Sequence, residues 1–199
     1  MLKNSNFGER VVGYEMPVFN ARELRAGTGI LLLIGMLAFA KAFFTQDFTF
    51  ANLFVTYFMI DFAMRLFIAP KFAPSLIIGH IFVQDQSPEY VGASQKKFAW
   101  SLAFAFAVTM FVVIVLMDLS SSIKMSLGTT LLILLFCEAI FGICLGCKLY
   151  PLFTQQASIC EGDSCGIKIK EPIQEVSIMQ YWVALVSIVS FIVIAYSYL

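Results

Sequence analysis

The segment Leu24–Phe44, LRAGTGILLLIGMLAFAKAFF, decides the fold. Its only charges are Arg25 and Lys41, and about 20 mostly apolar residues suffice for a helix to cross about 30 Å of hydrocarbon. The whole chain has the same character: 60% of its 199 residues are apolar and 13% are charged, with a mean hydropathy of +0.86. A soluble chain of this size cannot bury so much apolar surface. This composition argues against soluble enzymes and nucleic-acid-binding proteins.

Five segments are long and apolar enough to span a bilayer, and one shorter segment is not. The predicted fold class is therefore an all-α integral membrane protein, a five-span helical bundle, because backbone groups in lipid must bond within their own helix. The predicted spans are Leu24–Phe44, Phe48–Ile68, Phe98–Met117, Leu127–Leu145 and Tyr181–Leu199. The shorter segment, Ser75–Val83, is predicted to form an interfacial or re-entrant helix between spans two and three.

The spans divide the chain into four regions. Residues 1–23 form an N-terminal arm, 24–153 a four-span core, 154–179 a cysteine-containing loop and 180–199 the fifth transmembrane helix. Lysine and arginine gather in the arm and in the loops after spans two and four, and such loops face the cytoplasm. We therefore expect a cell (inner) membrane protein with a cytoplasmic N-terminus and an external C-terminus.

Besides Arg25 and Lys41 near the ends of the first span, three charged residues lie inside the predicted spans: Asp61, Arg65 and Glu138. Charges within a bilayer are costly and usually face protein partners. Asp61 and Arg65 share a helix face at the favourable i, i+4 spacing. If span four runs on toward Cys147, Asp61 and Glu138 both lie about 12–14 Å from the cytoplasmic helix ends. The three side chains are then expected to meet, either as a structural ion cluster or as proton-handling groups.

Four of the five cysteines form two close pairs. Cys144 and Cys147 form a C-x-x-C motif, and Cys160 and Cys165 lie in the following loop. A C-x-x-C often lowers the pKa of one thiol. The predicted end of span four opposes this, because a helix C-terminus disfavours a thiolate.

Three interpretations of the cysteines remain open. They could form a thiol-disulfide or sulfur-transfer site, a four-thiolate metal site made of Cys144, Cys147, Cys160 and Cys165, or a set of inert thiols. The G-x-x-x-G formed by Gly142 and Gly146 predicts tight packing against a neighbouring span. The lone His80 is expected to be an interfacial residue rather than a ligand.

Four motifs resemble those of a bacterial membrane family known as domain of unknown function 4395. They are DFAMRLF at Asp61–Phe67, PKFAP at Pro70–Pro74, KKFA at Lys96–Ala99 and EAIFGICLGCKLY at Glu138–Tyr150. The resemblance covers about Asn20–Phe153 and implies a small multi-span bundle. It also implies association with thioredoxin-like or rhodanese-like proteins, and hence thiol or sulfur chemistry. The second cysteine pair and the fifth span lie outside it.

These observations together predict a membrane-embedded dithiol. Cys144 or Cys147 would exchange with a soluble thioredoxin-like or rhodanese-like partner, Glu138 would accept a proton, and Arg65 would hold the charge of Glu138 or favour a thiolate. Cys160 and Cys165 would pass on electrons or sulfur. The alternatives are a non-catalytic accessory subunit of a larger membrane complex and a sulfur-compound transporter. The sequence indicates no particular cofactor.

Overall fold

A computed structural model describes residues 7–11 and 17–154, together with residues 178, 182 and 189. The helices and strands below all belong to one compact unit, residues 1–166. Cys160, Cys165 and most of the predicted fifth span lie outside the described residues, so the predictions for them stay predictions.

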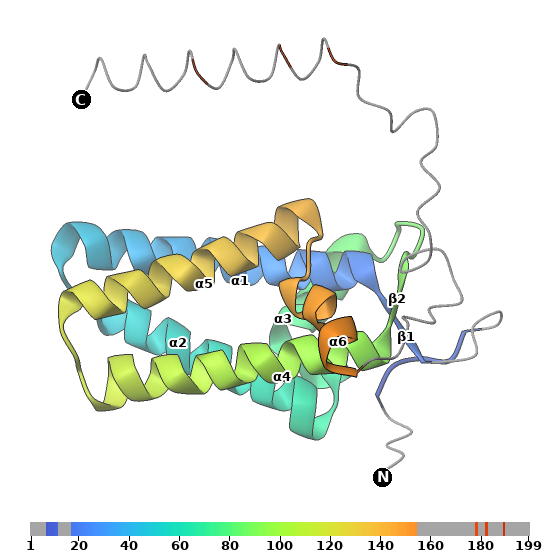
Figure 1. The fold of residues 1–199 in the computed structure, drawn as a ribbon, viewed down its shortest axis with the longest axis horizontal. Coiled ribbons are helices and arrows are strands. Elements are labelled where there is room, and N and C mark those ends of the chain that lie inside the picture. The colour runs from blue at the N-terminus through green and yellow to red at the C-terminus, as the bar shows by residue number, and fades with distance from the viewer. Residues whose placement is uncertain (1–6, 12–16, 155–177, 179–181, 183–188, 190–199) are drawn as a thin grey trace. The chain divides into compact units, whose positions relative to one another are not determined.

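Four long helices form the bundle (Figure 1). They are α1 (Ala21–Thr45), α2 (Thr49–Ala63) with a π-helical turn at Met64–Ile68, α4 (Ala93–Met110) with a π-helical turn at Phe111–Leu116, and α5 (Ser121–Phe141). All four are long and apolar enough to cross a membrane. The first four predicted spans are confirmed as helices, and a multi-pass membrane location follows from them.

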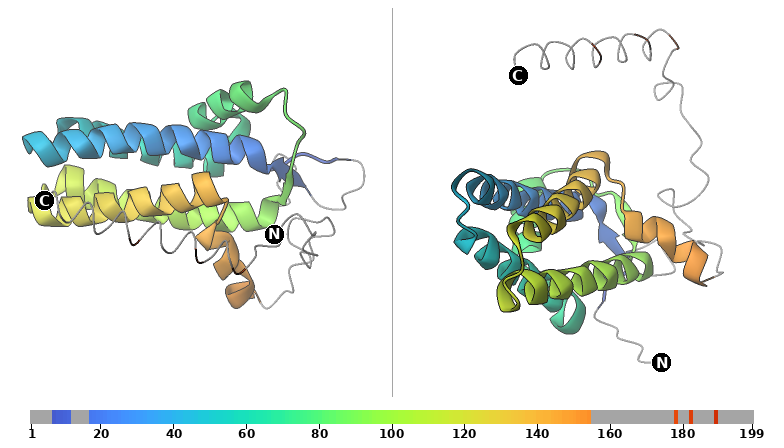
Figure 2. Two further views of the ribbon diagram at one scale, coloured as in Figure 1. Left: turned by 90° about the horizontal axis from the view of Figure 1, so that it is seen from above. Right: turned by 60° about the vertical axis from the view of Figure 1, so that its left-hand side comes forward.

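The smaller elements gather at one end of the bundle (Figures 1 and 2). They are strand β1 (Val18–Asn20), a 3₁₀ turn at Pro70–Phe72, helix α3 (Pro74–Val83), strand β2 (Tyr90–Gly92) and helix α6 (Leu145–Thr154). Among residues 17–154, the opposite end holds the short connections from α1 to α2 and from α4 to α5. We call the first end the foot of the bundle.

The strands were not predicted, so the molecule is mostly helical rather than all-α. β1 and β2 pair antiparallel, with Phe19 opposite Val91 and Asn20 opposite Tyr90. Asn20 also begins α1, because its side-chain oxygen accepts a hydrogen bond from the backbone N–H of Arg22 at 3.1 Å. A side-chain cap of this kind satisfies a donor that the first helical turn leaves unpaired.

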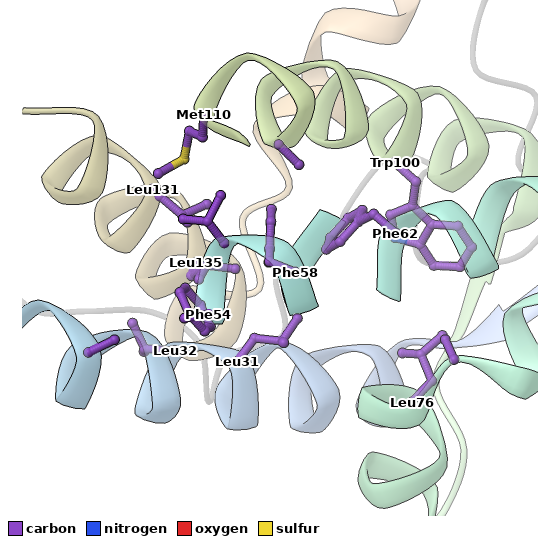
Figure 3. Close-up of a cluster of buried hydrophobic side chains, with 14 of the residues drawn as sticks. Leu31, Leu32, Phe54, Phe58, Phe62, Leu76, Trp100, Met110, Leu131 and Leu135 are labelled. Carbon is purple, nitrogen blue, oxygen red and sulfur yellow. The ribbon is translucent and has the colours of Figure 1, made fainter. Parts of the chain in front are cut away.

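The core lies between the four long helices (Figure 3). Phe54, Phe58 and Phe62 recur every four residues, so they line one face of α2, and all three are buried. They pack with Leu31 of α1 and Leu135 of α5. Large apolar side chains on the outer faces are exposed, as expected for helices that contact lipid.

Helix α3 packs closely against α1 through two glycines. A Cβ atom built on Gly79 would lie 2.7 Å from the backbone oxygen of Glu23 and 2.7 Å from the backbone nitrogen of Gly27. Small residues allow such backbone approach between apolar helices. The predicted short helix at Ser75–Val83 is confirmed, with Pro74 as its first residue.

Asp61 and Arg65 form a buried ion pair that includes Ser75 of α3. Their side chains are 0% and 1% exposed, and Arg65 donates to Asp61 through Nε and Nη2, both at 2.8 Å. Asp61 Oδ1 also accepts the Ser75 backbone N–H at 3.1 Å and its hydroxyl at 2.8 Å. The Arg65 guanidinium lies 4.3 Å from the Phe62 ring centroid and 5.4 Å from that of Trp100. This network joins α2, α3 and α4.

We predict that Arg65→Met destabilises the protein strongly. Removing one partner of a buried ion pair leaves the other charge uncompensated and costs about 3–5 kcal/mol. Thermal unfolding in detergent measures the effect. Lys41→Met is the control, because it removes an ion pair with Asp47 in which both side chains are more than 40% exposed. Such pairs contribute little, so its melting temperature should stay near that of the wild type. Equal melting temperatures for the two variants would contradict the prediction.

Candidate functional site

A break in the chain after α5 sets the position of the cysteine pair. The helix ends at Phe141 because Gly142 adopts a left-handed conformation with φ of 63°. The N–H groups of Gly142 and Ile143 bond back to the carbonyl oxygens of Glu138 and Cys137 at 3.1 and 3.0 Å. Glycine just past a helix end favours this conformation. The prediction that span four continues to Leu145 and Cys147 is therefore wrong.

Cys144 lies at the start of α6, not at the end of α5. Its carbonyl oxygen accepts the N–H of Lys148 at 3.1 Å, and its Sγ accepts the N–H of Cys147 at 3.3 Å. The sulfur thus occupies the place of a helix-capping oxygen. Free N–H groups and the helix dipole stabilise an anion at a helix N-terminus. The sequence placed the thiols at a helix C-terminus, which disfavours a thiolate, whereas the structure places Cys144 at a helix N-terminus, which favours one.

The two sulfurs of the C-x-x-C are close enough to react with one another. Cys147 Sγ donates to Cys144 Sγ at 2.7 Å and also lies 3.9 Å from the backbone oxygen of Gln95 in α4. Both cysteines are free thiols and half-buried. A disulfide needs sulfurs about 2.05 Å apart, so a partner that accepts two electrons and two protons could join them with only a small movement.

A partly buried ion pair lies next to the thiols. Lys96 Nζ donates to Glu138 Oε1 at 2.7 Å, and the two side chains are 8% and 23% exposed. Lys96 belongs to α4 and Glu138 to α5, so the pair joins two long helices beside the thiols. The positive charge of Lys96 and the negative charge of Glu138 both act on Cys144 and Cys147.

The two thiols differ in acidity. The pKa of Cys144 is lowered, mainly because the Cys147 thiol donates a hydrogen bond to it; burial opposes this effect, and the positive charge of Lys96 adds to it. The pKa of Cys147 is raised by donating that hydrogen bond and by burial. The thiolate is the reactive form of cysteine, and Cys144 is the more acidic thiol of the pair.

Lys96 is the site residue that the sequence analysis missed. A signal was present, because Lys96 precedes Ala99 by three positions and Trp100 by four, and all three are buried on one face of α4. Its neighbour Lys97 is exposed. The helical phase of the two lysines therefore indicated which one faces the protein.

The expected meeting of Asp61, Arg65 and Glu138 is not observed. Arg65 binds Asp61 and Ser75, whereas Glu138 pairs with Lys96. No ion pair joins the two groups within residues 17–154. Each group has its own partner: Lys96 of α4 pairs with Glu138, and Ser75 of α3 completes the bonding of Asp61 and Arg65. Glu138 also lies only three residues from the end of α5, about 4–5 Å along the helix, and not about 12–14 Å.

The two glycines beside Cys144 have separate roles. A Cβ atom on Gly146 would lie 2.7 Å from the Cα of Ala99, so α6 packs directly on α4. Gly142 lies under the Arg25 guanidinium, with Nη2 2.5 Å from where a Cβ would be. The packing interpretation is thus supported for Gly146. The G-x-x-x-G does not form one stripe, because its glycines lie on either side of a helix break.

The remaining candidate residues are placed as follows. His80 is 3.1 Å from Glu23 and largely exposed, which fits an interfacial residue. Among the described residues, no group of three or more metal-ligating side chains occurs. That search does not reach Cys160 and Cys165, so the four-cysteine metal site stays an untested alternative.

The fold and the site together define a class: a multi-pass membrane protein with a buried ion-pair network and a dithiol at the foot of its helical bundle. Residues 19–155 match the family model described as domain of unknown function (DUF4395), and the chain belongs to this family. The resemblance inferred from the motifs is confirmed. Comparisons with curated proteins and with solved structures find no match.

We predict that Gly142→Ala destabilises the protein. An alanine in the left-handed conformation costs about 1–2 kcal/mol, and its Cβ would also displace Arg25. Gly29→Ala is the matched control, because nothing lies within 4 Å of a Cβ at that helical position. Alanine favours a helix more than glycine does, so this control should be neutral or stabilising. If Gly142→Ala melts at or above the temperature of Gly29→Ala, Gly142 does not need the left-handed conformation assigned to it.

We also predict that iodoacetamide modifies Cys144 faster than Cys147 at neutral pH. A lowered pKa keeps Cys144 partly a thiolate below the ordinary range near 8.5, so its reaction should persist as the pH falls, whereas that of Cys147 should not. Tandem mass spectrometry of briefly alkylated protein distinguishes the two sites. Equal rates across the pH range would contradict the assigned asymmetry.

Proposed function

We propose that the protein is a membrane-embedded dithiol that takes part in thiol-disulfide exchange with a soluble thioredoxin-like partner. The observation that carries the proposal is the position of Cys144 at the N-terminus of α6, with its sulfur 2.7 Å from that of Cys147. Reactive dithiols require one stabilised thiolate and one neighbouring thiol, and this arrangement provides both.

The exchange proceeds in two steps. The Cys144 thiolate attacks one sulfur of a partner disulfide, forms a mixed disulfide and releases a partner thiolate. Cys147 then gives its proton to Glu138, and the resulting thiolate attacks Cys144 Sγ. The mixed disulfide breaks, and the second partner sulfur leaves as a thiolate. The pair loses two electrons and two protons, and the partner gains both; the reverse sequence reduces the pair.

The foot of the bundle is the side from which a partner would approach. Arg22, Arg25, Lys71, Lys96 and Lys97 all belong to this end, and the positive-inside rule assigns such an end to the cytoplasm. That compartment keeps thiols reduced and contains soluble dithiol proteins. Cys160 and Cys165 follow α6 in sequence, so they are proposed as a second pair that passes on electrons or sulfur.

Asp61 and Arg65 are proposed to be structural rather than catalytic. Both are fully buried, their charged atoms are bound to one another and to Ser75, and Arg65 does not contact Glu138. Buried ion pairs of this kind fix how helices pack. Lys96 takes the place that the sequence analysis gave to Arg65 as the cation beside Glu138.

Trapping of the mixed disulfide tests the proposal. Cys147→Ser leaves the attacking thiol and removes the resolving one, so it should accumulate a covalent complex with a thioredoxin-like protein. Non-reducing electrophoresis of membranes, with thioredoxin-like proteins identified by mass spectrometry, detects it. Cys144→Ser should trap none, and Cys137→Ser should behave like the wild type. A Cys147→Ser protein that forms no more complex than Cys144→Ser would refute the proposal and favour the accessory-subunit alternative.

A further inference from the structure

We propose that Lys96 is a positioning residue of the dithiol site, with an ammonium group for which the Glu138 carboxylate and the Cys144 thiolate compete. This inference rests on the proposed function and deepens it. Lys96 would have a different partner in each state of the site. It would pair with Glu138 while Cys144 is a thiol, and with the Cys144 thiolate once Cys144 has lost its proton.

The position of Lys96 in α4 supports the inference. Gln95, the residue before it, accepts a contact from Cys147 Sγ at 3.9 Å through its backbone oxygen. Ala99, one turn after it, lies directly under Gly146. These two contacts seat the first turn of α6 on the turn of α4 that carries Lys96.

The burial of Lys96 indicates that its charge is used inside the protein. A lysine side chain that is only 8% exposed has lost most of its water and needs a negative partner. Glu138 supplies that partner in the structure. When Cys144 loses its proton, a second anion enters the same site, and one ammonium must serve both.

The competition has a consequence for proton transfer. As Lys96 moves toward the Cys144 thiolate, its bond to Glu138 weakens, and the carboxylate oxygen that accepted it is left open to a new donor. Glu138 is then able to accept the proton of Cys147 at the step that needs it. Formation of the nucleophile and activation of the resolving thiol are thereby linked through one side chain.

Other charged groups near the thiols do not serve this purpose. Within residues 17–154, the elements around the thiols carry these charged and titratable groups: Lys96 and Lys97 of α4, Glu138 of α5, Cys147, Lys148 and Tyr150 of α6, and Arg25 of α1. Lys97 and Lys148 are exposed, and Arg25 pairs with Glu89 at 3.5 Å. Lys96 and Glu138 are the ionic side chains whose charges act on Cys144.

The pH dependence of Cys144 alkylation tests the inference. The full-length protein in nanodiscs, with Cys137, Cys160 and Cys165 changed to serine, is treated with iodoacetamide, and modification of Cys144 is measured by mass spectrometry. Lys96→Met should raise the midpoint of the profile by about one pH unit, because a cation beside the thiolate is lost. Glu138→Gln should lower it, because the competing anion is lost. Lys97→Met is the matched control and should leave it unchanged.

Opposite shifts distinguish an electrostatic role from a structural one. Shifts of the same sign in Lys96→Met and Glu138→Gln, or a Lys96→Met midpoint equal to that of Lys97→Met, would overturn the inference. If Lys96→Met does not fold, the double variant Lys96→Met/Glu138→Leu removes both buried charges. Its midpoint should lie above that of Glu138→Gln, because both variants lack the carboxylate and only the double variant also lacks the cation. Equal midpoints for these two variants would again overturn the inference.

The result also separates this inference from the proposed function. If wild-type Cys144 reacts as a thiolate and forms the mixed disulfide but is insensitive to Lys96, only the role of Lys96 fails. If wild-type Cys144 behaves as an ordinary thiol and no mixed disulfide forms, the proposed function fails as well.

Discussion

The ion pair between Asp61 and Arg65 is the constraint on which the rest of the foot depends. Two charges that are essentially inaccessible must be paired, and the pairing is complete only when Ser75 supplies its hydroxyl and backbone N–H to Asp61. This requirement fixes the first turn of α3 against α2. The Arg65 guanidinium also lies over the Trp100 ring, so the same pair helps to set the position of α4.

The same arrangement fixes the geometry of the thiol site. Trp100 and Lys96 are one turn apart on the buried face of α4, so fixing Trp100 also fixes the height and direction of Lys96. Ala99 lies on the same part of the helix and receives Gly146 of α6. A deeply buried structural network and a half-buried dithiol are therefore connected through a single turn of α4.

The sequence predicted the parts of the fold that depend on length and hydropathy. The second helical segment ends at Ile68 as predicted, because Pro70 prevents the helix from continuing. Its length also meets the minimum that a transmembrane helix needs. The break at Gly142 was missed because the apolar run continues through Ile143 and hydropathy carries no information on φ. The strand pair was missed because three-residue strands held by backbone bonds have no periodic signal.

The site shows why a small error in a helix boundary matters chemically. Placing the end of α5 beyond Cys144 gave the thiols a helix C-terminus. Ending the helix at Phe141 gives Cys144 a helix N-terminus. The residues of the motif are the same in both descriptions, but the sign of the dipole at the sulfur is opposite. A single glycine in the left-handed conformation thus separates an unfavourable site for a thiolate from a favourable one.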